Sequence, residues 1–231
     1  MSLTTSHPAP GVRPARRRGA GWLLPAGLIT FGLIPILANA LRRVALAAGA
    51  ADSSGGDGGG MPLPVILHVV GATVFVVLGA LQFSAGFRRR RPTWHRIAGR
   101  VAILAALLAA SSGLWLAFAT LSESSPLLFF FRLLAAAGMA LCIIFGFRAI
   151  RQRRLPRHRA WMIRAFALGL GAATQVFTLG FGEAIFGRSE LSIALLNGAG
   201  WAINLTVAEW VIRRTRRRVV RPAAARTGVR A

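Results

Sequence analysis

Two short motifs contain the residues of this sequence that are best suited to chemistry. The first joins His95 to Arg96 and the second joins His158 to Arg159. In both motifs an arginine lies four residues before the histidine, a proline lies between them, and a further arginine and a long apolar run follow. Imidazole binds metals and exchanges protons near neutral pH, whereas guanidinium pairs with phosphate and carboxylate. The motifs are therefore candidates for binding an anionic group or a metal-bearing cofactor.

The composition excludes several other kinds of chemistry. All 29 basic residues are arginine, so a phosphate-loop lysine and a Schiff-base lysine are absent. Tyrosine is absent as well, and the single cysteine, Cys142, excludes an internal disulfide and a cysteine-ligated iron–sulfur cluster. No two of the six acidic residues are close enough within one apolar run to suggest a carboxylate-bridged metal site. The usual chemistries of soluble enzymes are thus poorly supplied, and no residue is assigned a catalytic role.

The motifs are separated by apolar runs of the length that crosses a bilayer. Hydrophobic residues make up 55% of the 231 residues, and only 15% are charged. About 20 apolar residues are needed to span a membrane as a helix. The runs are continuous, which favours helices over the alternating strands of a barrel. The sequence predicts six transmembrane helices, at residues 21–41, 62–87, 97–121, 127–150, 160–186 and 191–212.

The distribution of arginine predicts the orientation of these helices. If the N-terminus is cytoplasmic, 25 of the 29 arginines fall on the cytoplasmic side. This bias follows the positive-inside rule and indicates that both termini are cytoplasmic. It also argues against a nucleic-acid-binding surface as the reason for the net charge of +23, since such a surface needs no apolar spacers of bilayer length. We expect residues 1–20 to form a disordered basic tail, 42–61 a flexible outer loop, and 213–231 a basic cytoplasmic tail that is disordered from 219.

The two histidine–arginine motifs then lie at the cytoplasmic interface, where three interpretations remain open. The motifs can simply anchor helix ends at the level of the lipid headgroups. They can bind an anionic lipid or another anionic ligand. Alternatively, His95 and His158 can be the two axial ligands of a single b-type haem whose propionates meet the arginines. The candidate binding residues are His95, Arg96, Arg100, His158, Arg159, Trp161 and Arg164.

Polar residues inside the apolar runs form a second group of candidates. His68 and Arg132 lie at similar depths in their runs, and Glu183 lies near the outer end of 160–186. A charge within the bilayer needs a partner, so we expect Arg132 to pair with Glu183 and to form an outer vestibule with His68. Such a vestibule would suit a small transporter. The intramembrane candidates are His68, Gln82, Arg132, Gln175 and Glu183.

The same motifs carry a resemblance to a known family. The pattern is His68…Gly79-x-x-Gln82-Phe83, then Arg88…His95-Arg96-x-x-Gly99-Arg100, then His158-Arg159-x-Trp161-Met162-Ile163-Arg164. Over roughly residues 62–186 it resembles the bacterial multi-pass membrane proteins catalogued as domain of unknown function 2306. The chain departs from the family where an aromatic residue, usually tyrosine, follows the Gly-Arg pair, because Val101 and Ala102 stand there. The resemblance implies an integral membrane location and no assigned chemistry.

Together these observations predict an all-α integral membrane bundle of six transmembrane helices, with the middle four arranged as two hairpins that repeat in parallel. We expect it in the bacterial cytoplasmic membrane. The expected partners are the lipid bilayer and its anionic phospholipids, and nucleic acid is not expected. Non-catalytic binding at the cytoplasmic loops, a single haem and a small transporter are the three functional hypotheses, and the oligomeric state is left open.

Overall fold

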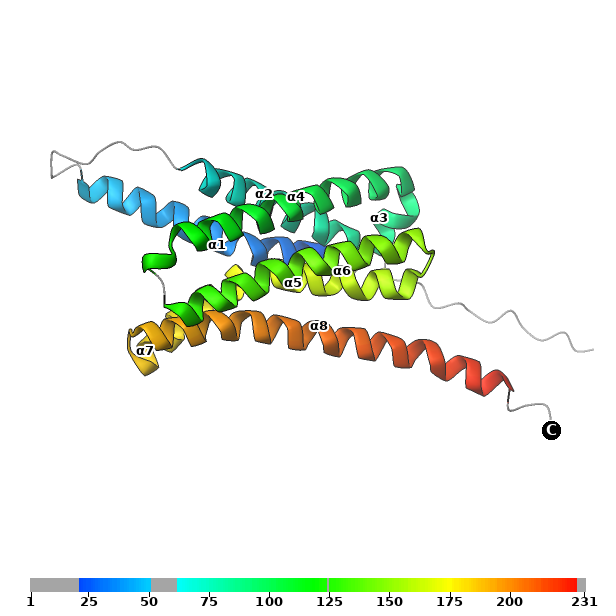
Figure 1. The fold of residues 1–231 in the computed structure, drawn as a ribbon. Helices are drawn as coiled ribbons and strands as arrows, with labels where there is room; N and C mark the ends of the chain where they lie inside the picture. The colour runs from blue at the N-terminus through cyan, green and yellow to red at the C-terminus, as the bar shows by residue number, and fades with distance from the viewer. Residues whose placement is uncertain (1–20, 51–61, 124, 228–231) are drawn as a thin grey trace, which may run out of the picture.

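The computed structural model describes residues 21–50, 62–123 and 125–227. Within these ranges the chain is helical apart from short turns, and it contains no strand. The elements are α1 (Leu23–Ala50), α2 (Leu63–Gln82), α3 (Ala85–Arg90), α4 (Pro92–Ala119), η1 (Leu121–Glu123), α5 (Pro126–Arg151), α6 (Leu155–Gly169), α7 (Gly171–Phe186) and α8 (Glu190–Thr227). The long helices lie side by side as an elongated bundle (Figure 1).

The surface of this bundle is apolar. Large side chains such as Leu104, Trp115 and Ile185 are 67%, 66% and 73% exposed. Among the described residues, five helices are each long and apolar enough to span a bilayer, and α6 with α7 makes a sixth if the two form one span. An apolar surface of this extent is stable in hydrocarbon and not in water. The predicted all-α membrane bundle is confirmed.

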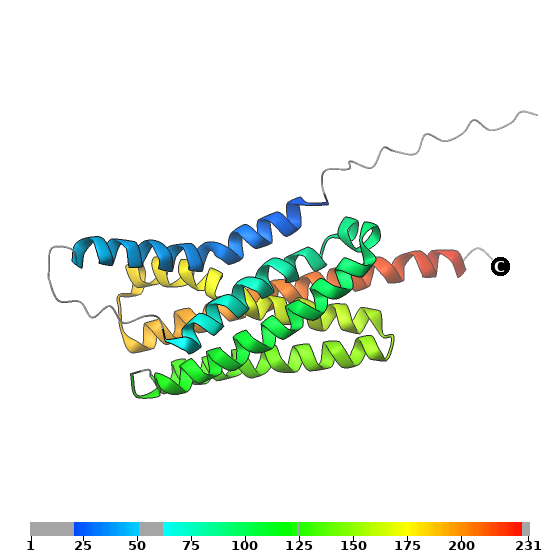
Figure 2. The ribbon, with the colours of Figure 1, turned by 90° about the horizontal axis from the view of Figure 1, so that it is seen from above.

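The middle helices form two hairpins whose turns lie at the same end of the bundle. Helices α2 and α4 are joined through α3, and α5 is joined to α6 by a short turn. Both turns lie at the right-hand end of Figure 1, toward which α8 also runs, and α1 starts on the same side (Figure 2). The two histidine–arginine motifs, which begin α4 and α6, are therefore brought to one end of the protein, as expected.

Small residues allow the helices of the first hairpin to pack closely. A Cβ atom at Gly71 of α2 would lie only 2.9 Å from the carbonyl oxygen of Ala105 and 3.0 Å from the amide nitrogen of Ala109, both on α4. This close approach of backbones is typical of membrane helices, where packing replaces the hydrophobic effect as the force between helices. The centre of the bundle contains Phe75 and Phe166, whose ring centroids lie 5.6 Å apart.

The span predicted as continuous over 160–186 is broken. Helices α6 and α7 meet at Leu170 with a bend of 42°. A Cβ at Gly169 would lie 2.5 Å from the Phe75 ring, and one at Gly171 would lie 2.1 Å from the Trp201 indole, so both rings press directly on the backbone. The side-chain amide of Asn204 also donates to the carbonyl of Ala167 at 3.2 Å. In a straight helix that carbonyl would accept the N–H of Gly171, and a side chain inserted there bends a helix.

Several other boundaries differ from the sequence-based expectation. Helix α1 extends to Ala50, so the first part of the predicted outer loop is helical, and residues 51–61 lie outside the described residues. Helix α8 extends to Thr227, through much of the tail predicted to be disordered. Both extensions are rich in alanine, arginine or leucine, which have high helix propensity. The predicted tail of residues 1–20 also lies outside the described residues.

Candidate functional site

One end of the bundle carries a dense set of exposed arginines, and we call it the arginine end. Its exposed members are Arg88, Arg89, Arg90, Arg91, Arg96, Arg100, Arg148, Arg151, Arg153, Arg154, Arg157, Arg159, Arg213, Arg214 and Arg216. Of the acidic residues in the described ranges, only Glu209 lies near this end. A surface of this kind has a strongly positive potential and attracts anions.

The first turn at this end is built from a capped helix and a proline. The Ser84 hydroxyl accepts a hydrogen bond from the N–H of Phe87 at 3.1 Å, which starts α3 immediately after α2 has ended. Helix α3 then presents three consecutive arginines in its last turn. Pro92 starts α4, where its missing N–H costs nothing. The predicted span of 62–87 is therefore divided here, and the arginines are held on a short helix.

The second turn holds an arginine in a conformation that favours glycine. Arg153 has a φ of 57°, in the left-handed region. Its N–H donates to the carbonyl of Ile150 at 3.0 Å, and the N–H of Arg154 donates to that of Ala149 at 2.9 Å. These two bonds form a Schellman motif, which ends α5 and usually has glycine at the left-handed position. A side chain at the left-handed position costs about 1 kcal/mol of stability. The turn nevertheless places the Arg153 guanidinium at this position.

The two motif histidines lie in the first turns of α4 and α6. Nδ1 of His158 lies 2.9 Å from the carbonyl oxygen of Gly146 on α5. If the neutral ring donates this bond, its Nε2 is left to accept a hydrogen bond or to bind a metal. Nδ1 of His95 is buried and has no hydrogen-bond partner among the described residues, and the His95 ring packs edge-on against Phe87 at 6.2 Å.

Tryptophans accompany the arginines on three helices and just before a fourth. Trp22 precedes α1, Trp94 lies in the first turn of α4, Trp161 lies in α6, and Trp210 lies in α8. Trp22, Trp94 and Trp210 are 53%, 60% and 58% exposed. Indole rings concentrate at the boundary between hydrocarbon and headgroups. Their positions mark that boundary just inside the arginine end.

Arg164, a predicted binding residue, is joined to Glu209 of α8. Its Nε donates to Oε1 at 2.5 Å and its Nη2 donates to Oε2 at 3.2 Å. The guanidinium carbon also lies 4.7 Å from the centre of the Trp161 ring. Arg213 lies four residues after Glu209, which is the spacing of a local helix pair, but the hydrogen bonds of Glu209 are made to Arg164 on another helix. Arg164 thus ties α6 to α8, whereas Arg96, Arg100 and Arg159 are exposed.

His68 packs between the helices of the first hairpin near the opposite end. Its Nδ1 lies 2.9 Å from the carbonyl oxygen of Ala109 and 3.5 Å from the Ser112 hydroxyl. A Cβ at Gly113 would lie 3.0 Å from the imidazole, so the missing side chain makes room for the ring. His68 and His158 therefore have the same arrangement, an imidazole Nδ1 directed at a carbonyl of the neighbouring helix, at opposite ends of the bundle.

The residues of the predicted outer vestibule contact different partners. Arg132 donates to the Thr120 hydroxyl at 3.1 Å. Glu183 lies 4.0 Å from Arg188, which is 77% exposed. The ion pair of Glu183 is with Arg188 and not with Arg132, so the structure does not show the predicted pairing of Arg132 with Glu183. The remaining candidate, Gln82, donates to the carbonyl of Leu78 in its own helix at 3.2 Å.

Polar side chains of α7 bind the backbone and side chains of α8. Gln175 donates to the carbonyl of Asn197 at 3.0 Å, Thr178 donates to that of Leu196 at 2.8 Å, and the Thr174 hydroxyl lies 2.8 Å from Oδ1 of Asn204. The sequence identifies these residues as polar near mid-membrane and favours this bonding between helices. The sequence does not identify the contact of Asn204 with α6. The only local sign of this contact is that an amide side chain lies within an apolar run.

The apolar exterior, the bilayer-length helices and the cationic end define a multi-pass helical membrane protein. A family model described as a predicted membrane protein, domain of unknown function 2306, matches residues 65–212. The chain belongs to this family, as the histidine–arginine motifs indicate. The match extends beyond the four middle helices and includes most of the membrane part of α8. No curated protein and no solved structure matches the chain.

Proposed function

We propose that this protein lies in the bacterial cytoplasmic membrane with its arginine end in the cytoplasm, and that this end binds the phosphates of anionic phospholipids. The observation that carries the proposal is the set of exposed arginines at one end, where the one acid among the described residues, Glu209, is already bound to Arg164. Each arginine near an anionic leaflet contributes about 1 kcal/mol of attraction. The arginine end therefore offers many cations to an anionic leaflet.

The arginines that directly follow the two motif histidines provide the most direct test of lipid binding. Arg96 and Arg159 are exposed in the first turns of α4 and α6, at the depth of the headgroups. Protein purified in mild detergent is analysed by native mass spectrometry for retained phosphatidylglycerol and cardiolipin. The variant with Arg96→Gln and Arg159→Gln should retain several-fold less anionic lipid than the wild type. Replacing both by lysine keeps the charge and should retain most of it, and Arg188→Gln, at the other end, should change nothing.

The outcome that contradicts the proposal is equal retention of anionic lipid by all of these proteins. Preferential retention of zwitterionic phosphatidylethanolamine by the wild type would contradict it as well. Either result would leave anchoring of helix ends as the role of the motifs.

The orientation has a separate test. Cysteines replacing Arg90, Arg153 or Arg188 are treated with a membrane-impermeant thiol reagent in intact spheroplasts, and the native Cys142 is buried and should stay unlabelled. We expect the cysteine at position 188 to be labelled in intact spheroplasts and those at positions 90 and 153 to be labelled only after lysis. Labelling of 90 and 153 from outside would reverse the proposed orientation, and labelling of only one of them would contradict a common end for the two turns.

A single b-type haem held by His95 and His158 is a second candidate function. What favours it is the buried Nδ1 of His95 without a hydrogen-bond partner among the described residues, at the same end of the bundle as His158, whose Nδ1 is already directed at a carbonyl. A reduced-minus-oxidised visible spectrum of protein from haem-sufficient cells tests it. A Soret band that disappears in His95→Ala and His158→Ala but persists in His68→Ala would support a haem. A colourless wild type would reject it.

A further inference from the structure

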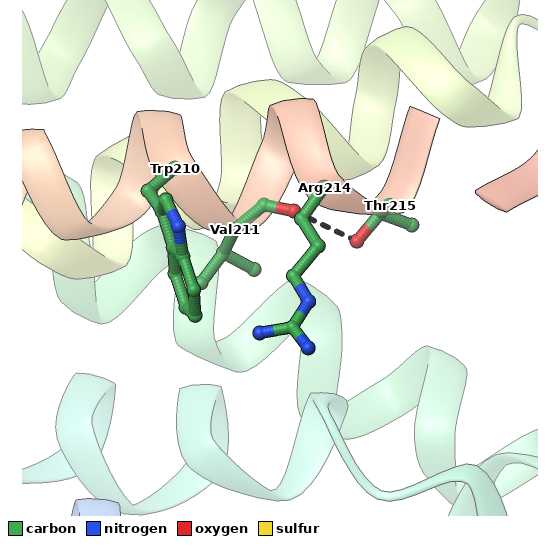
Figure 3. Close-up of a pocket in the computed structure, with 4 residues that line it drawn as sticks. All are labelled: Trp210, Val211, Arg214 and Thr215. Atoms are coloured by element: carbon green, nitrogen blue, oxygen red, sulfur yellow. Dashed lines mark hydrogen bonds between the residues drawn. The ribbon is translucent and has the colours of Figure 1, made fainter. Parts of the chain in front are cut away.

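A groove on α8 offers a defined position for one lipid at the arginine end. Trp210, Val211, Arg214 and Thr215 line a hollow of about 180 Å³ (Figure 3). The hollow is open to its surroundings and is wide enough to admit several waters or one phosphate group. Resting on the proposed function, we infer that this α8 groove binds the headgroup phosphate of an anionic phospholipid, with its acyl chains beside Trp210.

The groove is amphipathic along the direction in which a lipid lies. Trp210 and Arg214 are four residues apart and leave α8 on the same side, with the guanidinium carbon 5.1 Å from the centre of the indole. The indole N–H is a hydrogen-bond donor and the guanidinium is both a donor and a cation, whereas Val211 is apolar. The Thr215 hydroxyl donates to the carbonyl of Val211 at 2.8 Å, so its hydrogen is already used, and Trp210 and Arg214 supply the donors of the groove.

The second arginine–tryptophan pair of the protein shows why the phosphate would bind at Arg214. Arg164 stacks on Trp161 in the same way, but both of its bonds to Glu209 are made within the protein. Arg214 has no ion pair among the described residues and is exposed. Its planar guanidinium, held against the indole, can bind a phosphate through two parallel hydrogen bonds. Apart from Glu209, whose carboxylate is bound to Arg164, the neighbouring charges at this end are arginines, so the potential at the groove favours an anion.

Replacement of Arg214 tests the groove, and Arg216 provides the matched control. Both are exposed arginines near the end of the membrane part of α8, but Arg216 does not line the hollow. Purified, delipidated protein is titrated with phosphatidylglycerol carrying brominated acyl chains, which quench nearby indole fluorescence. We expect Arg214→Gln to weaken binding about tenfold, which corresponds to about 1.4 kcal/mol, and Arg216→Gln to weaken it less than threefold. Trp210→Phe should remove part of the quenching.

Three results would overturn the inference. Equal weakening by Arg214→Gln and Arg216→Gln would mean that only the general charge matters. Unchanged quenching in Trp210→Phe would place the acyl chains elsewhere. Displacement of the lipid by millimolar inorganic phosphate would mean that the site takes a free anion. Circular dichroism and gel filtration of each variant verify that it is folded.

The groove inference and the proposed function can be tested separately. If Arg96→Gln with Arg159→Gln reduces lipid retention and Arg214→Gln does not, the groove inference is wrong and lipid binding at the arginine end stands. If none of these variants reduces it, both are wrong.

Discussion

The ion pair between Arg164 and Glu209 should contribute measurably to the attachment of α8. Helix α8 packs on α5, α6 and α7, and this bidentate pair joins it to α6 close to the arginine end. A hydrogen bond to a charged group contributes about 1.5–3 kcal/mol when it is well shielded. The two side chains are 25% and 36% exposed, so solvent weakens the pair. We therefore expect a coupling free energy near the low end of that range, about 1.5 kcal/mol.

A double-mutant cycle measures this coupling directly. Arg164→Gln, Glu209→Gln and the double variant are unfolded in mixed micelles with increasing denaturing detergent, and the free energy of unfolding is compared with that of the wild type. Each single change should lower it by about 2 kcal/mol, because each leaves one charged partner without its bonds. The double variant should lose little more than either single one, since the second change removes a group that is already unpaired.

The pair of Glu183 with Arg188 provides the control for this cycle. Its closest atoms are 4.0 Å apart and Arg188 is 77% exposed. Exposed pairs of this geometry contribute about 0–1 kcal/mol, so the same substitutions should be nearly additive. Strict additivity at Arg164 and Glu209 as well would refute the view that their bond holds α8 to α6.

Three further changes test the packing of the bundle by the same unfolding measurement. Gly71→Ala should destabilise the protein by about 2 kcal/mol or more, because its Cβ would meet α4 backbone atoms at 2.9 and 3.0 Å. The control is Gly27→Ala, which should be neutral or stabilising because the new Cβ enters open space. Asn204→Leu should cost about 1 kcal/mol by removing the bond to Ala167, and no loss would mean that the bend does not need it. Arg153→Gly should stabilise the protein by about 1 kcal/mol by relieving its positive φ, while it weakens anionic lipid binding; a destabilised variant would contradict the strain.

The sequence predicts the membrane helices well because their signal is local. A run of about 20 apolar residues must cross the bilayer whatever its neighbours are, and the arginine clusters between the runs indicate which ends meet. The common end of His95 and His158 follows from these two facts. The break at Leu170 does not, because it depends on a ring of α2 and a ring of α8 that press on Gly169 and Gly171. Such contacts depend on how the helices are rotated in the bundle, which hydropathy does not specify.

The partners of individual polar groups were harder to predict for the same reason. Glu209 and Arg213 have the spacing of a helix pair, and nothing local indicates that Arg164, 45 residues earlier, is the partner. The expected pairing of Arg132 with Glu183 rests on their similar depth. Depth alone does not make two side chains on different helices face each other. The arginine end, in contrast, can be predicted without knowing how each helix is rotated, since its charges surround all the helix ends there.

The polar groups within the bundle also indicate where a ligand would bind. In hydrocarbon a polar side chain must find a partner, and the nearest acceptors are backbone carbonyls of neighbouring helices. That is the arrangement of His68 on Ala109, of Gln175 on Asn197 and of Thr178 on Leu196. These bonds use the polar atoms of the middle of the bundle, and of the end opposite the arginine end, to hold helices together. The exposed guanidiniums of the arginine end are not used in this way, and so it is there that binding of an anionic partner has groups to act through.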